Sequence, residues 1–442
     1  MTSSISAQLK WTLETFSRYW PGKTDLVLDL LLPQLIQPQK AELPPALCKV
    51  MLPEWASDCG VRGSILIPCN YLNPGNSYEW ERADWLGILF WYLHGVAERE
   101  YEKRFQPIHS YKFRLKGWDS EMWDYAWGNR VALFIRRWVA KNLDSHEENI
   151  FGKLPLGEIW ITHDVDAISK TFSIRIKQSV FQIVICGKSI FKRNWKEAVN
   201  RLKKATSFLL SSDNYLLTHK VIEIERDLGM RSVFLFYGGE SNKSLKKAFM
   251  DPGYSISDSQ IMDELNNLKV DGWGIGLHPS YTAWKNFNEL ADECKRVECA
   301  TGNKVQLCRQ HWLMFGWAST WRAQEKAGIE WDSTLAFNDY TGLRNGVALD
   351  FHPWNSDTNS AMALKCVPTI LMDSHLYDYN NFDESDRTAK MSRWLDEIKY
   401  VGGSVAINWH PHTLSLDYGW GSGFKTLLHL VKRSGLKTRK WD

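Results

Sequence analysis

The stretch EIWITHDVD, residues 158–166, is the part of the sequence that decides the fold. Its apolar run 159–161 predicts a short buried strand that ends abruptly in ionisable side chains. Asp164 and Asp166 project to the same side of an extended chain, roughly 6–7 Å apart. Two carboxylates so placed repel each other unless a cation, a proton or an arginine lies beside them. The pair therefore indicates a metal site or a general base, the alternative being a cap on the following helix or turn.

Composition narrows the class of protein. The chain of 442 residues is long enough for two or three domains with a sizeable core. Its charge is nearly balanced, with 54 Lys+Arg against 51 Asp+Glu, so no global basic field favours a nucleic-acid partner. The content of 23 Trp, 16 Tyr and 19 Phe fits either surfaces that stack on sugar rings or a core rich in large side chains.

Targeting signals and cysteine usage predict a cytoplasmic location. The start lacks a basic region followed by an apolar one, and no apolar run approaches the roughly 20 residues of a membrane-spanning helix. The eight cysteines are scattered and form no CxxC pair. They indicate reduced thiols rather than disulfides or a zinc site built on cysteine.

The sequence predicts two domains. Residues 1–150 alternate Pro-rich pieces with apolar and helical segments and contain no cluster of metal-ligating residues, which indicates an accessory domain of mixed α/β structure. A polar boundary follows, and residues 151–442 form the second domain. From residue 216 onward, helical patterns alternate with short strands at 232–237, 273–277, 305–308, 329–331, 363–367 and 404–408. Such alternation predicts a parallel α/β sheet or barrel.

The segment 170–204 is strongly basic. It carries ten Lys and Arg residues against Glu197 alone, with apolar residues between them. A segment of this kind can lie on an anionic membrane surface, as a peripheral contact, or bind an anionic substrate. A solvated helical insertion explains the same pattern.

Polar clusters follow five of the predicted strands. They are Thr162-His163-Asp164-Val165-Asp166, His278-Pro279-Ser280-Tyr281, Arg309-Gln310-His311-Trp312, Asp332-Ser333-Thr334 and Trp409-His410-Pro411-His412. In an α/β barrel the carboxyl ends of the strands meet on one face, where such folds carry their chemistry. An aspartate with two or three imidazoles suits one divalent metal, Zn²⁺ by default and Co²⁺, Ni²⁺ or Mn²⁺ as alternatives.

These motifs resemble the polysaccharide deacetylase (NodB-homology) superfamily, carbohydrate esterase family 4 and its relatives. The resemblance covers about residues 156–415 and is carried by HDVD at 163–166, HPSY at 278–281 and RQHW at 309–312. It implies a distorted NodB-like (β/α) barrel and a metal-dependent deacetylase. The N-terminal residues resemble, more loosely, the domain that precedes the deacetylase part in one bacterial branch.

The resemblance implies a set of metal ligands. Asp166 matches the metal-binding aspartate of the first motif, and His278 the first histidine of the second. The family's second histidine falls at Thr282 here, and His311 replaces a proline of the third motif. We therefore expect His311 to supply the missing ligand from the neighbouring strand.

The resemblance also implies the acid–base residues. Asp164 matches the catalytic base, Arg309 the arginine that braces this base, and His410 the general acid. Asp332 falls where the family places the aspartate that orients this histidine. His412 lies two residues after His410, so the sequence leaves open which of the two is the acid.

The expected reaction is hydrolysis of an N-acetyl group, or less readily an O-acetyl group, on a saccharide. Lipid-linked or nucleotide-linked intermediates of surface-glycan synthesis are the substrates that the resemblance implies. The candidate substrate contacts are Tyr281, Trp312, Arg344 in the loop 342–346, and His412. Two alternatives stay open: a catalytically degenerate carbohydrate-binding or scaffold protein on the same fold, and a metal-dependent hydrolase of a non-sugar amide.

Overall fold

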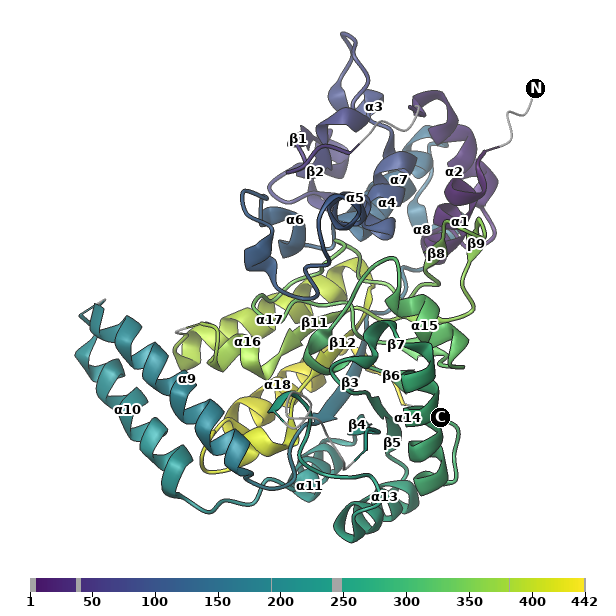
Figure 1. The fold of residues 1–442 in the computed structure, drawn as a ribbon. Coiled ribbons are helices and arrows are strands. Elements are labelled where there is room, and N and C mark those ends of the chain that lie inside the picture. The colour runs from purple at the N-terminus through teal and green to yellow at the C-terminus, as the bar shows by residue number, and fades with distance from the viewer. Residues whose placement is uncertain (1–4, 37–40, 192, 241–248, 381, 441–442) are drawn as a thin grey trace.

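The computed structural model describes residues 5–36, 41–191, 193–240, 249–380 and 382–440. One parallel sheet organises the larger part of the chain (Figure 1). Its strands follow the order β10-β7-β6-β5-β4-β3-β12-β11, and β13 pairs with one end of β3. They are β3 (Glu158–Val165), β4 (Val233–Tyr237), β5 (Gly274–His278), β6 (Leu307–Cys308), β7 (Trp331–Asp332), β10 (Lys365–Cys366), β11 (Thr369–Met372), β12 (Ser404–Asn408) and β13 (Lys437–Thr438).

The two edge strands of this sheet are neighbours in the sequence. β10 ends at Cys366 and β11 begins at Thr369, so at most about 11 Å of chain joins the two edges. The sheet must therefore curl until its edges approach each other, as a half-closed barrel does. This arrangement confirms the predicted α/β class and curled parallel sheet. The central strand β3 is buried along nearly its whole length, as the apolar run at its start predicted.

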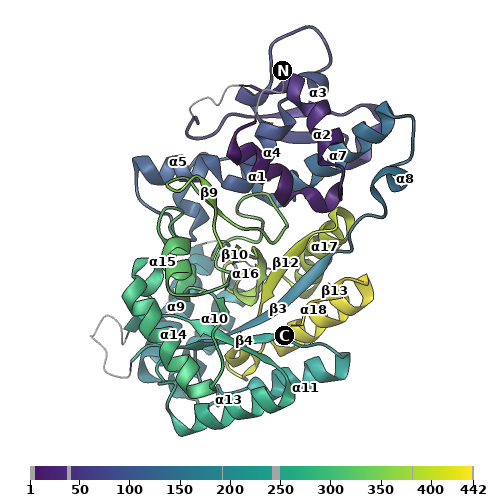
Figure 2. The same ribbon diagram turned by 90° about the vertical axis from the view of Figure 1, so that its right-hand side faces the viewer.

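Helices cover the outside of the curled sheet (Figure 2). They are α11 (Thr218–Leu228), α13 (Ser259–Asp271), α14 (Phe287–Thr301), α15 (Thr320–Lys326), α16 (Asp373–Tyr377), α17 (Glu384–Val401) and α18 (Gly421–Ser434). Three of them, α11, α14 and α17, end at a glycine. Gly229, Gly302 and Gly402 have φ of +74°, +69° and +63°, a left-handed conformation that glycine adopts without a steric cost.

The N-terminal residues build a layer at one end of the sheet, uppermost in Figure 1. It holds an antiparallel pair, β1 (Leu47–Met51) and β2 (Ser64–Pro68), among helices. The helices are α1 (Ala7–Thr15), α2 (Thr24–Leu31), α3 (Glu79–Arg82), α4 (Trp85–His94), α5 (Val96–Arg104), α6 (Glu121–Asp124), α7 (Trp127–Asn142) and α8 (Glu147–Phe151). A single hydrophobic core runs through this layer and the sheet. The ion pairs Arg130–Glu397 and Arg344–Glu98 also join the two parts. The division at residue 150 stays a prediction.

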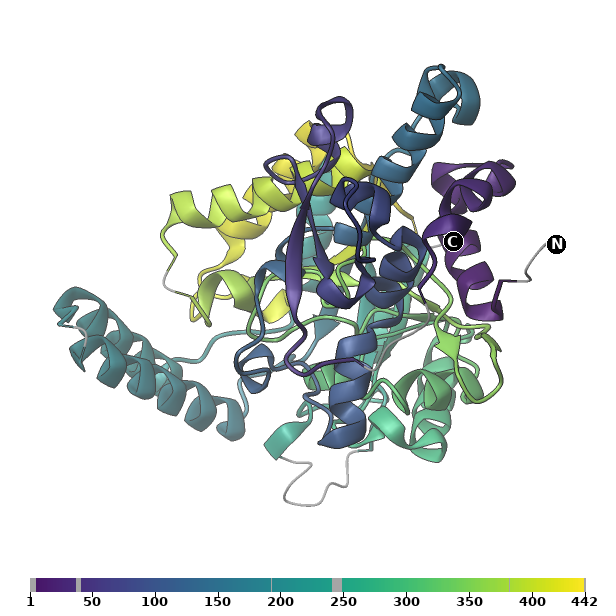
Figure 3. The same cartoon turned by 90° about the horizontal axis from the view of Figure 1, so that it is seen from above.

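Two features lie outside these layers. The short pair β8 (Trp354–Asn355) and β9 (Ser360–Ala361) packs near α1. The basic segment forms a hairpin of two helices, α9 (Phe172–Phe191) and α10 (Trp195–Leu210), which projects away from the sheet (Figure 3). Among the described residues, no helix is long and apolar enough to cross a membrane.

Candidate metal and acid–base site

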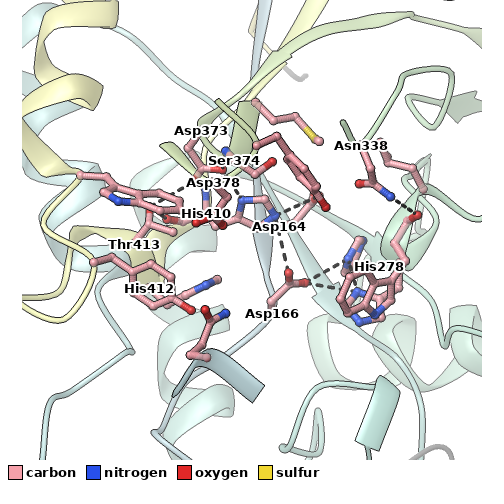
Figure 4. A pocket seen from close by; sticks show the side chains of 18 of the residues that line it. Asp164, Asp166, His278, Asn338, Asp373, Ser374, Asp378, His410, His412 and Thr413 are labelled. Atoms are coloured by element: carbon pink, nitrogen blue, oxygen red, sulfur yellow. Dashed lines mark hydrogen bonds and ion pairs between the residues drawn. The ribbon is translucent and has the colours of Figure 1, made fainter. Parts of the chain in front are cut away.

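Polar side chains from four of the five predicted clusters converge at the carboxyl ends of the strands (Figure 4). Asp164 lies near the end of β3, and Asp166 follows this strand directly. His278 closes β5, and His410 follows β12. All four line one cavity together with His311, which follows β6. Parallel strands bring these residues together because their carboxyl ends share one rim of the sheet.

Asp166, His278 and His311 form a compact group of potential metal ligands. One ligand atom of each lies within 4.8 Å of the others. Asp166 Oδ1 is 3.1 Å from His278 Nε2 and 3.4 Å from His311 Nδ1, and these two ring nitrogens are 2.8 Å apart. The three residues that the sequence proposed as ligands are therefore close enough to hold one common ion.

The hydrogen bonds around this group fit a cation. His278 Nδ1 lies 2.6 Å from the backbone oxygen of Arg309, and His311 Nε2 lies 2.9 Å from that of Met250. A carbonyl oxygen accepts only, so neutral rings with their protons at these oxygens would turn the lone pairs of His278 Nε2 and His311 Nδ1 toward an ion beside Asp166. Asp166 Oδ1 is buried and accepts no hydrogen bond from the described residues. Three electron-donating atoms thus face one point, which suits a divalent metal.

The charge state of Asp166 agrees with this arrangement. Burial opposes ionisation, but protonated imidazoles at His311 and His278 hold the pKa of Asp166 well below its usual range, and a cation at the same place would act in the same direction. The carboxylate is therefore ionised at neutral pH. The position of the family's second histidine, Thr282, instead donates a hydrogen bond to Glu289 Oε1 at 2.9 Å.

Arg309 holds Asp164 in a buried network. Its Nη1 donates to Asp164 Oδ1 at 2.9 Å, and its other donors reach Thr162, Ser333 and Thr369. The opposite oxygen, Asp164 Oδ2, accepts from Asn408 Nδ2 at 2.8 Å. Asn408 reaches this oxygen because β12 pairs in register with β3. Asp164 is thereby fixed in position with one oxygen toward the cavity.

His410 is oriented by Asp373, a residue that follows β11. Its Nδ1 lies 2.7 Å from Asp373 Oδ1, and its backbone N–H donates to Asp373 Oδ2 at 2.9 Å. This leaves Nε2 facing Asp166 Oδ2 at 3.5 Å and Asp164 Oδ2 at 3.9 Å. Burial alone would lower the pKa of His410, but the Asp373 carboxylate and the two other aspartates raise it to about 10. His410 is therefore protonated at neutral pH.

His412 has the opposite electrostatic setting. It lines the same cavity, but burial and the neighbouring His410 charge lower its pKa to about 4. A neutral imidazole cannot donate as an imidazolium does. Of the two histidines, only His410 is bonded to Asp373, so the geometry favours His410 as the proton donor.

The prediction that Asp332 orients His410 is wrong. Asp332 is fully buried and accepts hydrogen bonds from Trp321 Nε1, Gln324 Nε2 and Thr334. It closes β7, but its side chain lies away from the cavity. Asp373 holds this position instead, and a signal for it was present: the apolar run 370–372 precedes it, much as strands end at or before the other site residues.

The predicted substrate contacts divide into two groups. Trp312 and His412 line the cavity, as expected. Arg344 does not: it is buried in an ion pair with Glu98 of α5, among the rings of Phe315, Trp317 and Phe337. Tyr281 is absent from the described lining of the cavity, and its backbone N–H donates to Asp251. The assignment of Arg344 as a substrate contact is wrong, and that of Tyr281 stays a prediction.

Comparisons with known proteins give similarity at the level of structure. No protein-family model and no curated protein sequence matches the chain. A solved structure assigned as a polysaccharide deacetylase from Mycobacterium smegmatis is 13% identical with a TM-score of 0.39, covering 64% of this chain and 86% of its own. The chitin deacetylase of Colletotrichum lindemuthianum is 11% identical with a TM-score of 0.32, covering 64% and 85%.

A further similar structure is a carbohydrate esterase family 4 pseudoenzyme from Bacillus anthracis, 10% identical with a TM-score of 0.29, covering 66% of this chain and 69% of its own.

Proposed function

We propose that this protein is a metal-dependent hydrolase that removes an N-acetyl group from a saccharide. The observation that carries the proposal is the arrangement of three charge groups around one cavity. Asp166, His278 and His311 turn lone pairs to one point, an arginine-held carboxylate lies on one side, and a protonated histidine lies on the other. A ligand group, a base and an acid are the parts that amide hydrolysis requires.

The ligand group would hold the divalent ion that activates the substrate carbonyl and the attacking water. A divalent ion bound by Asp166, His278 and His311 would polarise the substrate carbonyl and lower the pKa of water. Zn²⁺ suits a set of two imidazoles and one carboxylate, and Co²⁺, Ni²⁺ or Mn²⁺ also accept it. The backbone oxygens that fix both rings keep the ligand atoms aimed at one place.

Asp164 and His410 move the protons. Asp164 takes a proton from the attacking water, because Arg309 and Asn408 hold its carboxylate at the cavity wall. His410 Nε2 donates a proton to the departing group, while Asp373 holds its Nδ1. An amine is a poor leaving group until it is protonated, so an imidazolium beside the cavity favours an amide over an ester substrate.

Aromatic side chains suit the cavity to a saccharide. Trp312, Trp420, Tyr379 and Tyr418 line it beside the acid–base residues. Apolar ring faces stack on the C–H faces of sugars, and their polar edges hydrogen-bond with hydroxyl groups. Surface-glycan intermediates carried on a lipid or a nucleotide are the saccharides that we propose, within a cytoplasmic protein.

The test is to measure metal content and acetate release on the same preparations. The wild-type chain is expected to bind about one divalent ion and to release acetate from N-acetylated oligosaccharides. His311→Ala should lose most of both. His352→Ala is the matched control, because this half-buried histidine lies outside the cavity.

Three outcomes contradict the proposal. Equal metal content in the wild type and His311→Ala removes His311 from the ligand group. Metal binding without acetate release, alongside opening of a cyclic imide or ureide, identifies a hydrolase of a non-sugar amide. Neither metal nor hydrolysis would identify a degenerate carbohydrate-binding protein.

A further inference from the structure

The hairpin α9–α10 buries Ser179, Gln182 and Arg201 together with Ala198, Ala205 and Phe208, and it exposes many large apolar side chains. Between the two helices, Ser179 donates to the backbone oxygen of Ala205 at 2.9 Å, and Arg201 donates to Gln182 at 3.1 Å. Ser179, Gln182 and Arg201 are all buried. A helix pair in water normally does the reverse and buries its apolar stripe. The outward face of this hairpin is therefore built for a surrounding other than water.

The outward apolar residues form one stripe along each helix. On α9 they are Phe172, Ile176, Val180, Ile183, Val184, Ile190 and Phe191, and on α10 they are Trp195, Val199, Leu202, Leu209 and Leu210. Along each helix they recur mainly at intervals of three or four residues, the spacing that places side chains on one face. Phe191 is 91% exposed and Trp195 is 63% exposed, at the tip that projects farthest from the sheet (Figure 3). Scattered exposed apolar residues are ordinary, but two aligned stripes mark a contact surface.

Cations border these stripes. Lys188 on α9, Arg193 in the turn, and Lys196 and Lys203 on α10 are exposed. The acid of this segment, Glu197, pairs with the buried Arg201 and leaves the outward charge positive. Apolar side chains flanked by exposed lysines are the pattern with which a helix lies in the interface of an anionic lipid bilayer.

We propose that the α9–α10 hairpin docks this protein on the surface of an anionic lipid bilayer. The apolar stripes enter the boundary between headgroups and acyl chains, and the bordering cations attract the anionic headgroups. A second copy of the chain fits this surface less well, because it would bring the same cations against those of the first.

The hairpin also connects the surface with the site. Ile174, Lys177 and Phe181 of α9 form one wall of a cavity of about 540 Å³, and Asp166, Trp312 and other site residues form the opposite wall. Docking would therefore present the site to a saccharide that a membrane lipid carries. This consequence for the substrate rests on the proposed function, whereas docking itself does not.

The experiment is co-sedimentation of the full chain with vesicles. Vesicles of phosphatidylcholine are compared with vesicles in which about one-third of the lipid is phosphatidylglycerol. The wild type is expected to bind only the anionic vesicles and to be released as ionic strength rises from about 0.1 M to about 0.5 M. No binding to anionic vesicles at either ionic strength overturns the proposal.

Two sets of substitutions test the apolar stripes and the bordering cations separately. Replacing Ile183, Val184 and Leu202 together by Ser is expected to weaken binding at least about tenfold. Replacing Lys188, Lys196 and Lys203 together by Glu is expected to weaken it at least about a hundredfold. The matched control replaces Leu143, Leu156 and Val270 by Ser, three exposed apolar residues outside the hairpin. It should bind as the wild type does.

Further measurements distinguish the remaining explanations. Wild-type affinity in both hairpin variants overturns the proposal. The proposal is also overturned if the wild type does not bind vesicles but forms a dimer in analytical ultracentrifugation, and the Ser variant does not form this dimer. Acetate release from a soluble oligosaccharide without vesicles should be equal in the wild type and the Ser variant. A hairpin variant that loses vesicle binding and keeps acetate release supports docking independently of the reaction. A protein that binds vesicles but releases no acetate contradicts the proposed function and leaves docking intact.

Discussion

Arg309 at the site and Arg344 beneath the N-terminal layer each pair with a buried carboxylate. The distances are similar: 2.9 Å from Arg309 Nη1 to Asp164 and 2.9 Å from Arg344 Nη2 to Glu98. Their surroundings differ. Asp164 borders a cavity and lies 3.9 Å from the protonated His410, whereas Arg344 lies among three aromatic rings.

The difference shows that burial and pairing do not by themselves make a pair functional. A charge pair enclosed by rings and backbone has nothing further to react with, so it fixes how two parts of the chain meet. A pair that leaves one carboxylate oxygen at a cavity can accept a proton there. The comparison therefore predicts that variants of the first pair change chemistry and variants of the second change stability.

The largest expected effect is that of Asp164→Asn. The amide keeps the shape of the side chain but cannot accept the proton of water, so acetate release should fall about 10³- to 10⁴-fold. Metal content should be unchanged, because Asp164 lies outside the ligand group. Activity within tenfold of the wild type would remove Asp164 from its role as base. Loss of metal would place it among the ligands instead.

Glu98→Gln should reverse this pattern. It leaves the buried Arg344 without its anionic partner, which typically costs about 3–5 kcal/mol of unfolding free energy. Urea unfolding measures this loss, and acetate release per folded molecule should stay unchanged. The control is Glu330→Gln, since its pair with Lys304 is exposed and contributes about 0–1 kcal/mol. A fall in activity at unchanged stability would bring the second pair into the catalytic machinery.

The sequence alone predicted the site residues that lie at the carboxyl ends of strands. Asp164, Asp166, His278, His311 and His410 each lie at or directly after the end of a strand in the parallel sheet, and strand order alone brings such ends together. The alternation of apolar and helical segments revealed most of these strands. The class of fold and the group of potential ligands could therefore be predicted without knowing any distance.

What the sequence did not reveal depends on contacts between distant segments. Arg344 lies in a polar loop like a substrate contact, and only its packing against α5, 246 residues earlier, shows that it is enclosed. Asp332 closes a short strand and Asp373 follows one, and the direction of each side chain depends on how far the sheet curls. The sequence marked the segment 170–204 as basic with apolar residues between the cations, but which of these side chains face outward cannot be deduced before the two helices are paired.

A third buried carboxylate sharpens the comparison, because its principal partner is not an arginine. Glu293 accepts hydrogen bonds from the backbone N–H and the hydroxyl of Ser280, and burial raises its pKa from 4.5 to about 7. Between these values the folded chain keeps a proton that the unfolded chain releases. The contribution of Glu293 to stability therefore falls as pH rises from 4.5 to about 7, by about 3 kcal/mol in all.

Glu293→Gln should abolish this dependence. Urea unfolding of the wild type and the variant at about pH 5 and about pH 8 measures it, and the wild type should lose about 3 kcal/mol relative to the variant between the two. The neutral amide has no proton to release in this range. Parallel pH dependence of the two proteins would show that Glu293 is ionised in the folded chain throughout.

The smallest expected effect is that of Asp373→Asn, which removes the principal charge that holds the proton on His410. Acetate release should fall about 10- to 100-fold at neutral pH, because the acid loses its orientation and part of its proton. Burial lowers the pKa of His410 and Asp373 raises it, so the variant's pKa should lie below the wild-type value of about 10. A general acid acts only when protonated, so the alkaline limb of the pH–rate profile should move to lower pH.

Asp378→Asn is the matched control: Asp378 lines the same cavity, and no hydrogen bond of the described residues joins it to His410. If the alkaline limb moves equally in both variants, the total negative charge of the cavity sets the pKa of His410, and the bond to Asp373 does not.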